Sequence, residues 1–347
     1  MTRPHAIPAM PNAHSHAFQR ALRGAGERPT GDRDSFWTWR EVMYGLVGEL
    51  DPEAMRAAAR ASFEAMRAAG YGAVGEFHYV HHPPGTTEAV VAAAGEAGLD
   101  LVLLPAAYHR GGHERFRDAT VGAFLERVEG LRAAGVRCGV AAHSVRAVPA
   151  EWLREIAAYA EAHGLVRHVH AAEQPAELEQ CRAEHGCSPV ELLHRTGFLG
   201  PRTSVVHGIH VSDLDVALLA ETETIVVTCP TTEANLGDGH FPADRLLEAG
   251  VRIAVGSDSN VRVDPFEECR ELETNARRQS LSRSGPLARL GGDLWGELVR
   301  NGCASLGIES AGAVEVDRDH PDLRGVSDGD LPWALATCAS AAAVLPA

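Results

Sequence analysis

The sequence predicts an α/β fold in which eight parallel strands, each followed by a helix, close into a (β/α)8 barrel of the TIM type. Short apolar runs alternate with longer amphipathic segments, and eight such runs occur in the 347 residues. Polar side chains also gather at the carboxyl ends of these runs, where barrel enzymes build their sites. An open, doubly wound sheet is the alternative, but no Gly-x-Gly-x-x-Gly follows the first run.

The apolar runs are nearly continuous, as expected of strands that are buried on both faces. They cover residues 6–16, 71–79, 99–108, 136–145, 165–173, 203–211, 224–230 and 251–259. The segments between them are rich in alanine, and several end in glycine, which is typical of a left-handed helix C-cap. We predict helices over residues 52–69, 86–97, 121–134, 150–163, 176–196, 212–221 and 243–249, and over 266–282 and 293–306 after the last strand.

Two regions of different composition suggest the domain organisation. Residues 1–306 alternate between strand and helix patterns without a break, so we assign them to one barrel domain. Residues 307–347 are rich in Gly, Asp and Ala and have little periodicity. We predict that they form a C-terminal tail, either irregular or the remnant of an accessory domain.

Charge and cysteine content exclude several classes of protein. A net charge of −15 argues against nucleic acid or an anionic membrane as a partner. The first residues lack the apolar stretch of a signal peptide, and no run of 18 apolar residues occurs. The seven scattered cysteines predict reduced thiols, and the sequence as a whole predicts a cytoplasmic protein.

A pair of histidines at the end of the first strand is the strongest chemical signal. Side chains alternate between the faces of a strand, so His14 and His16 point the same way. Two imidazoles on one face are half of a site for zinc or iron, although a chance pair is conceivable among 18 histidines. Other strands end in polar residues, namely Glu76, His78, Tyr79, His143, Arg146, His170, Glu173, His207, His210 and Asp258.

The order of these residues resembles the amidohydrolase superfamily: His-x-His after the first strand, His after the fifth and sixth, and Asp after the eighth. Five local sequences resemble the formimidoylglutamate deiminases within it, and the likeness runs from about Pro8 to about Leu306. They are Met-Pro-Asn-Ala-His-Ser-His-Ala-Phe-Gln-Arg at 10–20, Glu-Phe-His-Tyr-Val-His-His at 76–82, His-Val-His-Ala-Ala-Glu-Gln at 168–174, Cys-Pro-Thr-Thr-Glu-Ala-Asn-Leu-Gly-Asp-Gly at 229–239 and Gly-Ser-Asp-Ser at 256–259.

This resemblance implies one divalent metal per subunit, most often zinc with iron as the alternative, held by His14, His16, His170 and Asp258. It also implies that Asp258 accepts a proton from water and that Glu173 delivers one to the leaving nitrogen. His207 would polarise the amidine carbon or orient the water. No lysine ends the fifth strand, so a bridging carbamylated lysine and a second metal are not expected.

The family's substrate is a small anionic amidine with two carboxylates. The resemblance implies that Arg40 and Arg146 bind these carboxylates, because the planar fork of arginine matches a carboxylate. Gln19, Tyr79 and His143 would complete the pocket. The implied reaction is hydrolysis of N-formimino-L-glutamate to N-formyl-L-glutamate and ammonia in histidine degradation.

Two other functions stay open. A related deiminase could act on another amidine or guanidine diacid, such as N-guanidinoglutarate, with the same metal site. A barrel that has lost catalysis and serves in binding is the third reading, which the complete set of metal ligands disfavours.

The chain departs from the family at its ends and at one site position. Family members usually carry a longer segment before the metal motif, which forms a small β-sandwich with C-terminal strands, so we expect this sandwich to be missing or vestigial. Its loss would leave Ile7, Met10, Leu306 and Ile308 on an uncovered apolar flank, from which we predict a homodimer. Asn260 stands where a histidine is common.

Overall fold

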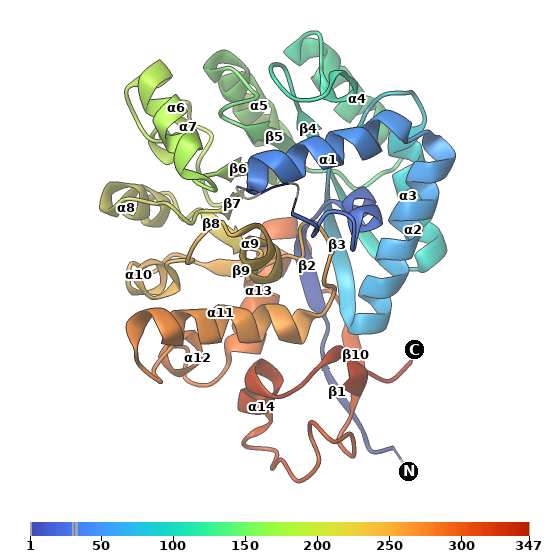
Figure 1. Cartoon of the computed structure of the whole chain (residues 1–347), viewed down its shortest axis with the longest axis vertical. Coiled ribbons are helices and arrows are strands. Elements are labelled where there is room, and N and C mark those ends of the chain that lie inside the picture. The colour runs from blue at the N-terminus through green and yellow to red at the C-terminus, as the bar shows by residue number, and fades with distance from the viewer. Residues whose placement is uncertain (1, 30, 32–33, 347) are drawn as a thin grey trace.

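The computed structural model describes residues 2–29, 31 and 34–346, and it confirms the barrel (Figure 1). Eight parallel strands follow one another in sequence order around a single sheet. They are β2 (Met10–Ser15), β3 (Tyr71–His78), β4 (Asp100–Ala107), β5 (Val140–Ser144), β6 (Arg167–Ala171), β7 (Thr203–His207), β8 (Ile225–Thr228) and β9 (Ile253–Val255). The ring closes through a parallel bridge between Ser15 and Asp258. The barrel is therefore sealed at the residues that carry the predicted site.

Helices surround the strands in the order expected from the sequence, together with two short helices that were not predicted, α9 (Pro230–Leu236) and α12 (Pro286–Arg289). The others are α2 (Pro52–Ala69), α3 (Thr86–Ala97), α4 (Val121–Ala133), α5 (Ala150–His163), α6 (Pro175–His185), α7 (Pro189–Arg195), α8 (Asp213–Glu221), α10 (Ala243–Glu248), α11 (Pro265–Ser280) and α13 (Leu294–Leu306). The helix predicted over 176–196 is wrong as a single element. Gly186 ends α6 with φ 67°, and Ser188 begins α7 with a capping box.

Helix α1 (Phe36–Glu49) was not predicted from the sequence, and its position matters for the site. Trp39, Met43 and Val47 recur at four-residue spacing and form its buried face. This periodicity was the signal that could have revealed the helix. The guanidinium of Arg115 donates hydrogen bonds to the carbonyls of Val47 and Leu50, which satisfies free carbonyls at the end of α1.

The first predicted strand, residues 6–16, is wrong as one element because two sheets share it. β1 (Pro4–Pro8) pairs antiparallel with β10 (Ala313–Asp317), with Ile7 opposite Val314, while β2 belongs to the barrel. Between them, the N–H of Ala9 donates to the carbonyl of Gly312. In Figure 1 this two-stranded sheet lies at one end of the molecule, with both chain termini beside it.

The expectation of an uncovered flank is wrong. Ile7, Met10 and Leu306 have exposed fractions of 4%, 0% and 2%, because residues after 306 cover this side of the barrel. Ile308, the fourth residue of that flank, is half-buried and packs against the core. A Cβ added to Gly72 in β3 would lie 1.9 Å from the carbonyl oxygen of Ala311, so the tail packs directly on the strand. Helix α14 (Leu331–Thr337) packs beside α11 and α13.

Two further structural findings concern the whole chain. All seven cysteines are free thiols. Across the part of the chain that the structure describes, no helix has both the length and the apolar character needed to cross a membrane.

Candidate active site

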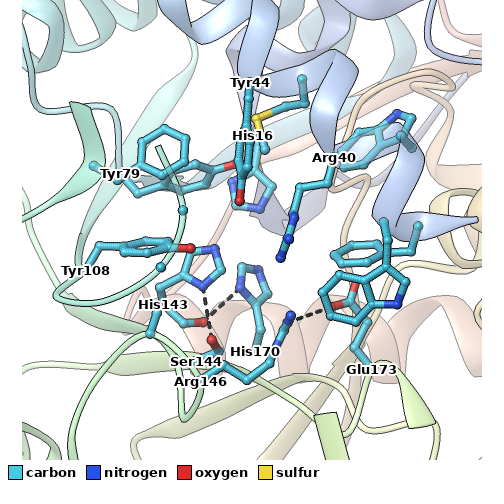
Figure 2. A pocket seen from close by; sticks show the side chains of 18 of the residues that line it. His16, Arg40, Tyr44, Tyr79, Tyr108, His143, Ser144, Arg146, His170 and Glu173 are labelled. Atoms are coloured by element: carbon cyan, nitrogen blue, oxygen red, sulfur yellow. Dashed lines mark hydrogen bonds and ion pairs between the residues drawn. The ribbon is translucent and has the colours of Figure 1, made fainter. Parts of the chain in front are cut away.

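A cavity of about 300 Å3 opens at the carboxyl ends of the barrel strands (Figure 2). Side chains of β5, β6 and β7, and of the residues that directly follow β2, β3 and β9, form its floor, and residues of α1 and of the segment after β4 form its walls. The predicted residues that line it are His16, Gln19, Arg40, Tyr79, His143, Arg146, His170, Glu173, His207 and Asp258. His14 lies beneath this floor and is completely buried.

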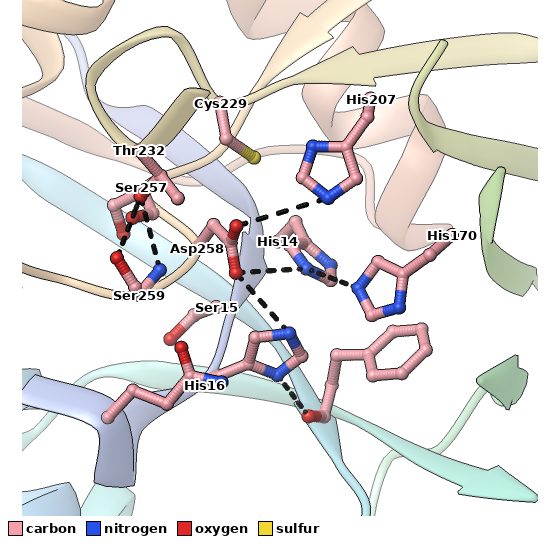
Figure 3. A network of polar contacts seen from close by, with 12 residues as sticks. His14, Ser15, His16, His170, His207, Cys229, Thr232, Ser257, Asp258 and Ser259 are labelled. Atoms are coloured by element: carbon pink, nitrogen blue, oxygen red, sulfur yellow. Dashed lines mark hydrogen bonds and ion pairs between the residues drawn. The ribbon is translucent and has the colours of Figure 1, made fainter. Parts of the chain in front are cut away.

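Three histidines converge at the bottom of the cavity (Figure 3). The ligand atoms that His14, His16 and His170 could offer to a metal lie within 4.8 Å of one another. His14 Nε2 is 3.1 Å from His170 Nε2, and Asp258 Oδ1 is 3.3 Å from His16 Nε2 and 3.6 Å from His14 Nε2. These four residues are those that the sequence singled out as metal ligands.

The hydrogen bonds on the far side of two rings orient them for metal binding. His16 Nδ1 donates to the carbonyl of Phe77 at 2.8 Å, and His170 Nδ1 donates to the carbonyl of His143 at 2.9 Å. This tautomer leaves the lone pair of each Nε2 directed at the common centre. Burial lowers the pKa of His14 to about 3 and lowers the pKa values of His16 and His170, so all three rings are neutral, which is the form that binds metal.

The donor set therefore fits a divalent cation. His14 Nδ1 is buried without a hydrogen-bond partner among the described residues, whereas its Nε2 lies 3.1 Å from His170 Nε2 and 3.6 Å from Asp258 Oδ1, so Nε2 is the atom that faces the shared centre. Three imidazole nitrogens and one carboxylate are the ligands that a catalytic zinc ion accepts, with a further position open for water.

Asp258 is held in its place by a strained backbone. It has φ 45°, and His207 has φ 74°, both in the left-handed region that non-glycine residues rarely adopt. The N–H of Asp258 donates to the carbonyl of His14, and the N–H of His16 donates to the carbonyl of Asp258. Burial favours a higher pKa for Asp258, but the hydrogen bond with His14 and the nearby histidines hold it below its usual range, so the group stays ionised.

A buried polar frame supports the loop of Asp258. Asn260 donates from Nδ2 to Ser15 Oγ at 3.1 Å and accepts a hydrogen bond from Ser257 Oγ at 2.6 Å. Glu76 accepts hydrogen bonds from Ser15 Oγ and from the N–H of Ala17, both at 2.7 Å. The departure at Asn260 therefore falls beneath the ligands, in the frame that joins β2 to β9.

Glu173 and His207 form a second polar group beside the histidine cluster. Glu173 Oε1 is 3.7 Å from His207 Nε2, and His207 Nδ1 donates to Glu233 Oε1 at 3.3 Å. Burial alone lowers the pKa of His207, but Glu173 and the hydrogen bond to Glu233 raise it to about 10, so this ring is charged. Burial raises the pKa of Glu173, against the opposing charges of His207 and Arg146. The pair can hold or release a proton at the rim of the metal site.

The outer part of the cavity carries cationic side chains. Figure 2 shows Arg40, from α1, and Arg146, after β5, directed toward each other. Arg146 Nη2 lies 3.5 Å from Glu173 Oε2, and the Nε atoms of both arginines are buried without a hydrogen-bond partner among the described residues. Two incompletely paired guanidinium groups in a small cavity favour an anionic ligand.

Neutral polar groups line the space between the arginines and the histidines. Gln19 Nε2 donates to the hydroxyl of Tyr79 at 2.8 Å, while Gln19 Oε1 is buried and has no partner within the described residues. His143 Nδ1 lies 3.2 Å from Ser144 Oγ, and its ring packs against that of Tyr108 with centroids 4.5 Å apart. Tyr108 also approaches Gly112, whose added Cβ would lie 2.4 Å from the Tyr108 hydroxyl, so this wall is closely packed.

Sequence reasoning missed three residues that shape the site. Glu233 binds His207 and also accepts hydrogen bonds from Thr228 Oγ1 and the N–H of Cys229. Trp37 and Tyr44 lie on α1 and line the cavity. Because α1 was not predicted, their approach to the barrel mouth could not be inferred.

Comparison with known proteins agrees with this geometry. A sequence model of the amidohydrolase family matches residues 6–290. The chain is 38% identical to formimidoylglutamate deiminase from Pseudomonas aeruginosa, over 94% of this chain and 77% of that protein. It is 30% identical to 5-methylthioadenosine/S-adenosylhomocysteine deaminase from Haloarcula marismortui, over 93% of this chain and 75% of that protein.

Two solved structures have similar folds. The crystal structure of an amidohydrolase from Brucella melitensis superposes on this chain with a TM-score of 0.85 at 31% sequence identity. The aligned region covers 98% of this chain and 84% of that protein. An adenosine deaminase from Xanthomonas campestris with bound zinc has a TM-score of 0.84 at 21% identity, covering 98% of this chain and 78% of its own.

Proposed function

Because the chain belongs to the amidohydrolase family, we propose that it is a metal-dependent hydrolase that converts N-formimino-L-glutamate to N-formyl-L-glutamate and ammonia. One observation carries the proposal: a three-histidine centre and two incompletely paired arginines share one cavity of about 300 Å3. The centre suits hydrolysis of a C–N bond, and the arginines suit a small diacid.

We assign one divalent metal, zinc in the first place and iron as the alternative, to His14, His16, His170 and Asp258. A cation bound there would act as a Lewis acid and lower the pKa of a water from about 15.7 to about 7.

The surrounding side chains have separate tasks in this proposal. Asp258, which stays ionised, accepts the proton of the attacking water. Glu173 gives a proton to the nitrogen that leaves as ammonia, because it lies at the rim of the centre and burial raises its pKa. His207, held by Glu233 and positively charged, keeps its Nε2 directed between Glu173 Oε1 and Asp258 Oδ2, at 3.7 Å and 4.0 Å.

The outer cavity binds the diacid. Arg40 and Arg146 each take one carboxylate, while the free Oε1 of Gln19 accepts an N–H of the amidine. Tyr79 fixes the Gln19 amide, and His143 completes the wall.

Ammonia release from N-formimino-L-glutamate by the purified, metal-replete protein tests the proposal directly. N-guanidinoglutarate is the comparison substrate, since the same arginines suit any amidine or guanidine diacid. A higher kcat/KM on the guanidine would reassign the substrate. Bound metal with no turnover of either compound would favour a barrel that only binds ligands.

Arg146→Met should lower kcat/KM for the diacid by about 2–4 kcal/mol of transition-state stabilisation, because a substrate carboxylate loses its charged partner. Arg154→Met on α5 is a matched substitution outside the cavity and should have no effect. An equal loss on a neutral amidine would place the carboxylate site elsewhere.

The cytoplasmic location and the homodimer stay proposals. The apolar flank that motivated the dimer is covered within one chain, so an interface would have to use another surface. Light scattering across a range of concentrations measures the oligomeric state: a mass near 74 kDa, about twice the 37.0 kDa of the chain, supports the dimer. A constant monomer mass would exclude it.

A further inference from the structure

The two arginines of the cavity share an aromatic neighbour that neither the metal chemistry nor the carboxylate contacts require. The Cζ atom of Arg40 lies 4.7 Å from the centroid of the Trp37 ring, and that of Arg146 lies 5.5 Å from it. Trp37 is half-buried, lines the cavity and precedes Arg40 by three residues on α1, so the two side chains share one face of the helix.

Other groups around the arginines do not explain why both guanidiniums stay at this position. Two like charges that approach the same ring repel each other. Among the described residues, Glu173 provides the one carboxylate within ion-pair distance of Arg146, at 3.5 Å. Arg40 also lies over Tyr44, at 5.4 Å, and Arg146 over Phe36, at 5.9 Å, but Trp37 is the ring that contacts both. Indole has the strongest cation–π attraction of the aromatic side chains.

We propose that Trp37 is a positioning residue that holds Arg40 and Arg146 beside one indole ring, so that their guanidinium groups are preorganised for a ligand with two carboxylates. The inference rests on the proposed function in that it takes a dicarboxylate as the ligand. In the free protein the electron-rich face of the ring offsets the repulsion between the cations, and the dianion offsets it when bound. Without the ring, the repulsion between the two guanidinium groups would be less offset, and the groups would no longer be held in place for one ligand.

Equilibrium binding of glutarate tests this inference without any need for turnover. We expect Trp37→Leu to weaken glutarate binding by about five- to tenfold, whereas butyrate, which engages one arginine, should change by less than about twofold. Trp37→Phe keeps an aromatic face and should recover most of the affinity. Trp333→Leu, an exposed tryptophan of α14 outside the cavity, is the matched control and should bind glutarate like the original protein.

Kinetics provide a second measurement. If the deiminase reaction is present, Trp37→Leu should raise KM for the diacid about five- to tenfold with kcat within about twofold, because the ring touches the arginines and not the reacting atoms.

Unchanged glutarate affinity in Trp37→Leu overturns the proposal, and so does equal weakening in the Leu and Phe variants. If Trp37→Leu does not fold, Trp37→Phe and Arg40→Met provide the test. The proposal is supported if Trp37→Phe weakens the binding of both ligands by less than about twofold while Arg40→Met abolishes it. Selective loss of butyrate binding in Trp37→Phe overturns the proposal. Glutarate binding without ammonia release contradicts the proposed reaction and leaves the role of Trp37 standing.

Discussion

Replacing Glu173 with Gln should lower kcat by about a hundredfold or more while the metal content stays the same, which is the scale of general acid–base catalysis. Glutamine keeps the shape of the side chain and its place near His207 Nε2, but it cannot carry a proton to the leaving nitrogen. The tetrahedral intermediate of amidine hydrolysis expels ammonia only when that nitrogen is protonated, so this step should become slow and limit kcat.

Burst kinetics and elemental analysis of the same samples check the result. Glu179→Gln, an exposed residue of α6, is the matched control and should retain full activity. A Glu173→Gln variant that keeps most of its kcat with full metal would move the proton transfer to another group, and His207 is the first candidate because its Nε2 also faces Asp258.

Replacing His16 with Ala should remove most of the bound metal and, with it, the activity. The substitution removes one of three imidazoles and also the contact of His16 Nε2 with Asp258 Oδ1 at 3.3 Å. Loss of a residue that only orients a ligand costs about 10–100-fold in metal affinity or activity, and loss of a ligand itself should cost more.

Elemental analysis of the original protein and the variant measures this directly. We expect about one metal per chain in the original protein and well under half of that in His16→Ala. His163→Ala, an exposed histidine of α5, should keep the full content. Equal occupancy in His16→Ala and the original protein would contradict the assignment of the centre.

Much of the fold was predictable because its elements are locally encoded. Helix α2 begins and ends where its amphipathic pattern, its Asp51 cap and the left-handed Gly70 place it, and α5 ends in the same way at the left-handed Gly164. The predictions failed where a strand pairs with a segment that is distant in the sequence. Residues 6–16 read as one strand, but Pro4–Pro8 pairs with Ala313–Asp317, more than 300 positions away in the sequence. No local sequence pattern predicts which distant segment such a strand pairs with.

The sequence by itself predicted the barrel, its strand order and the His14–His16 pair, and the resemblance that it carries added His170 and Asp258 to the candidate metal ligands. Alternation of side chains along a strand, together with the common edge formed by parallel strands, places His14, His16, His170 and Asp258 at one end of the barrel. Their assignment as one ligand set came from the resemblance to the amidohydrolase superfamily.

Only the tertiary structure decided what surrounds that centre. The charge on His207 depends on Glu173 and Glu233, which come from different β/α units, and the geometry of Arg40 and Arg146 depends on Trp37 of a helix that was not predicted. It also decided that the tail covers Ile7, Met10 and Leu306. Electrostatic and packing energies are set by distances through space, and residues far apart in the chain acquire those distances only when the barrel closes.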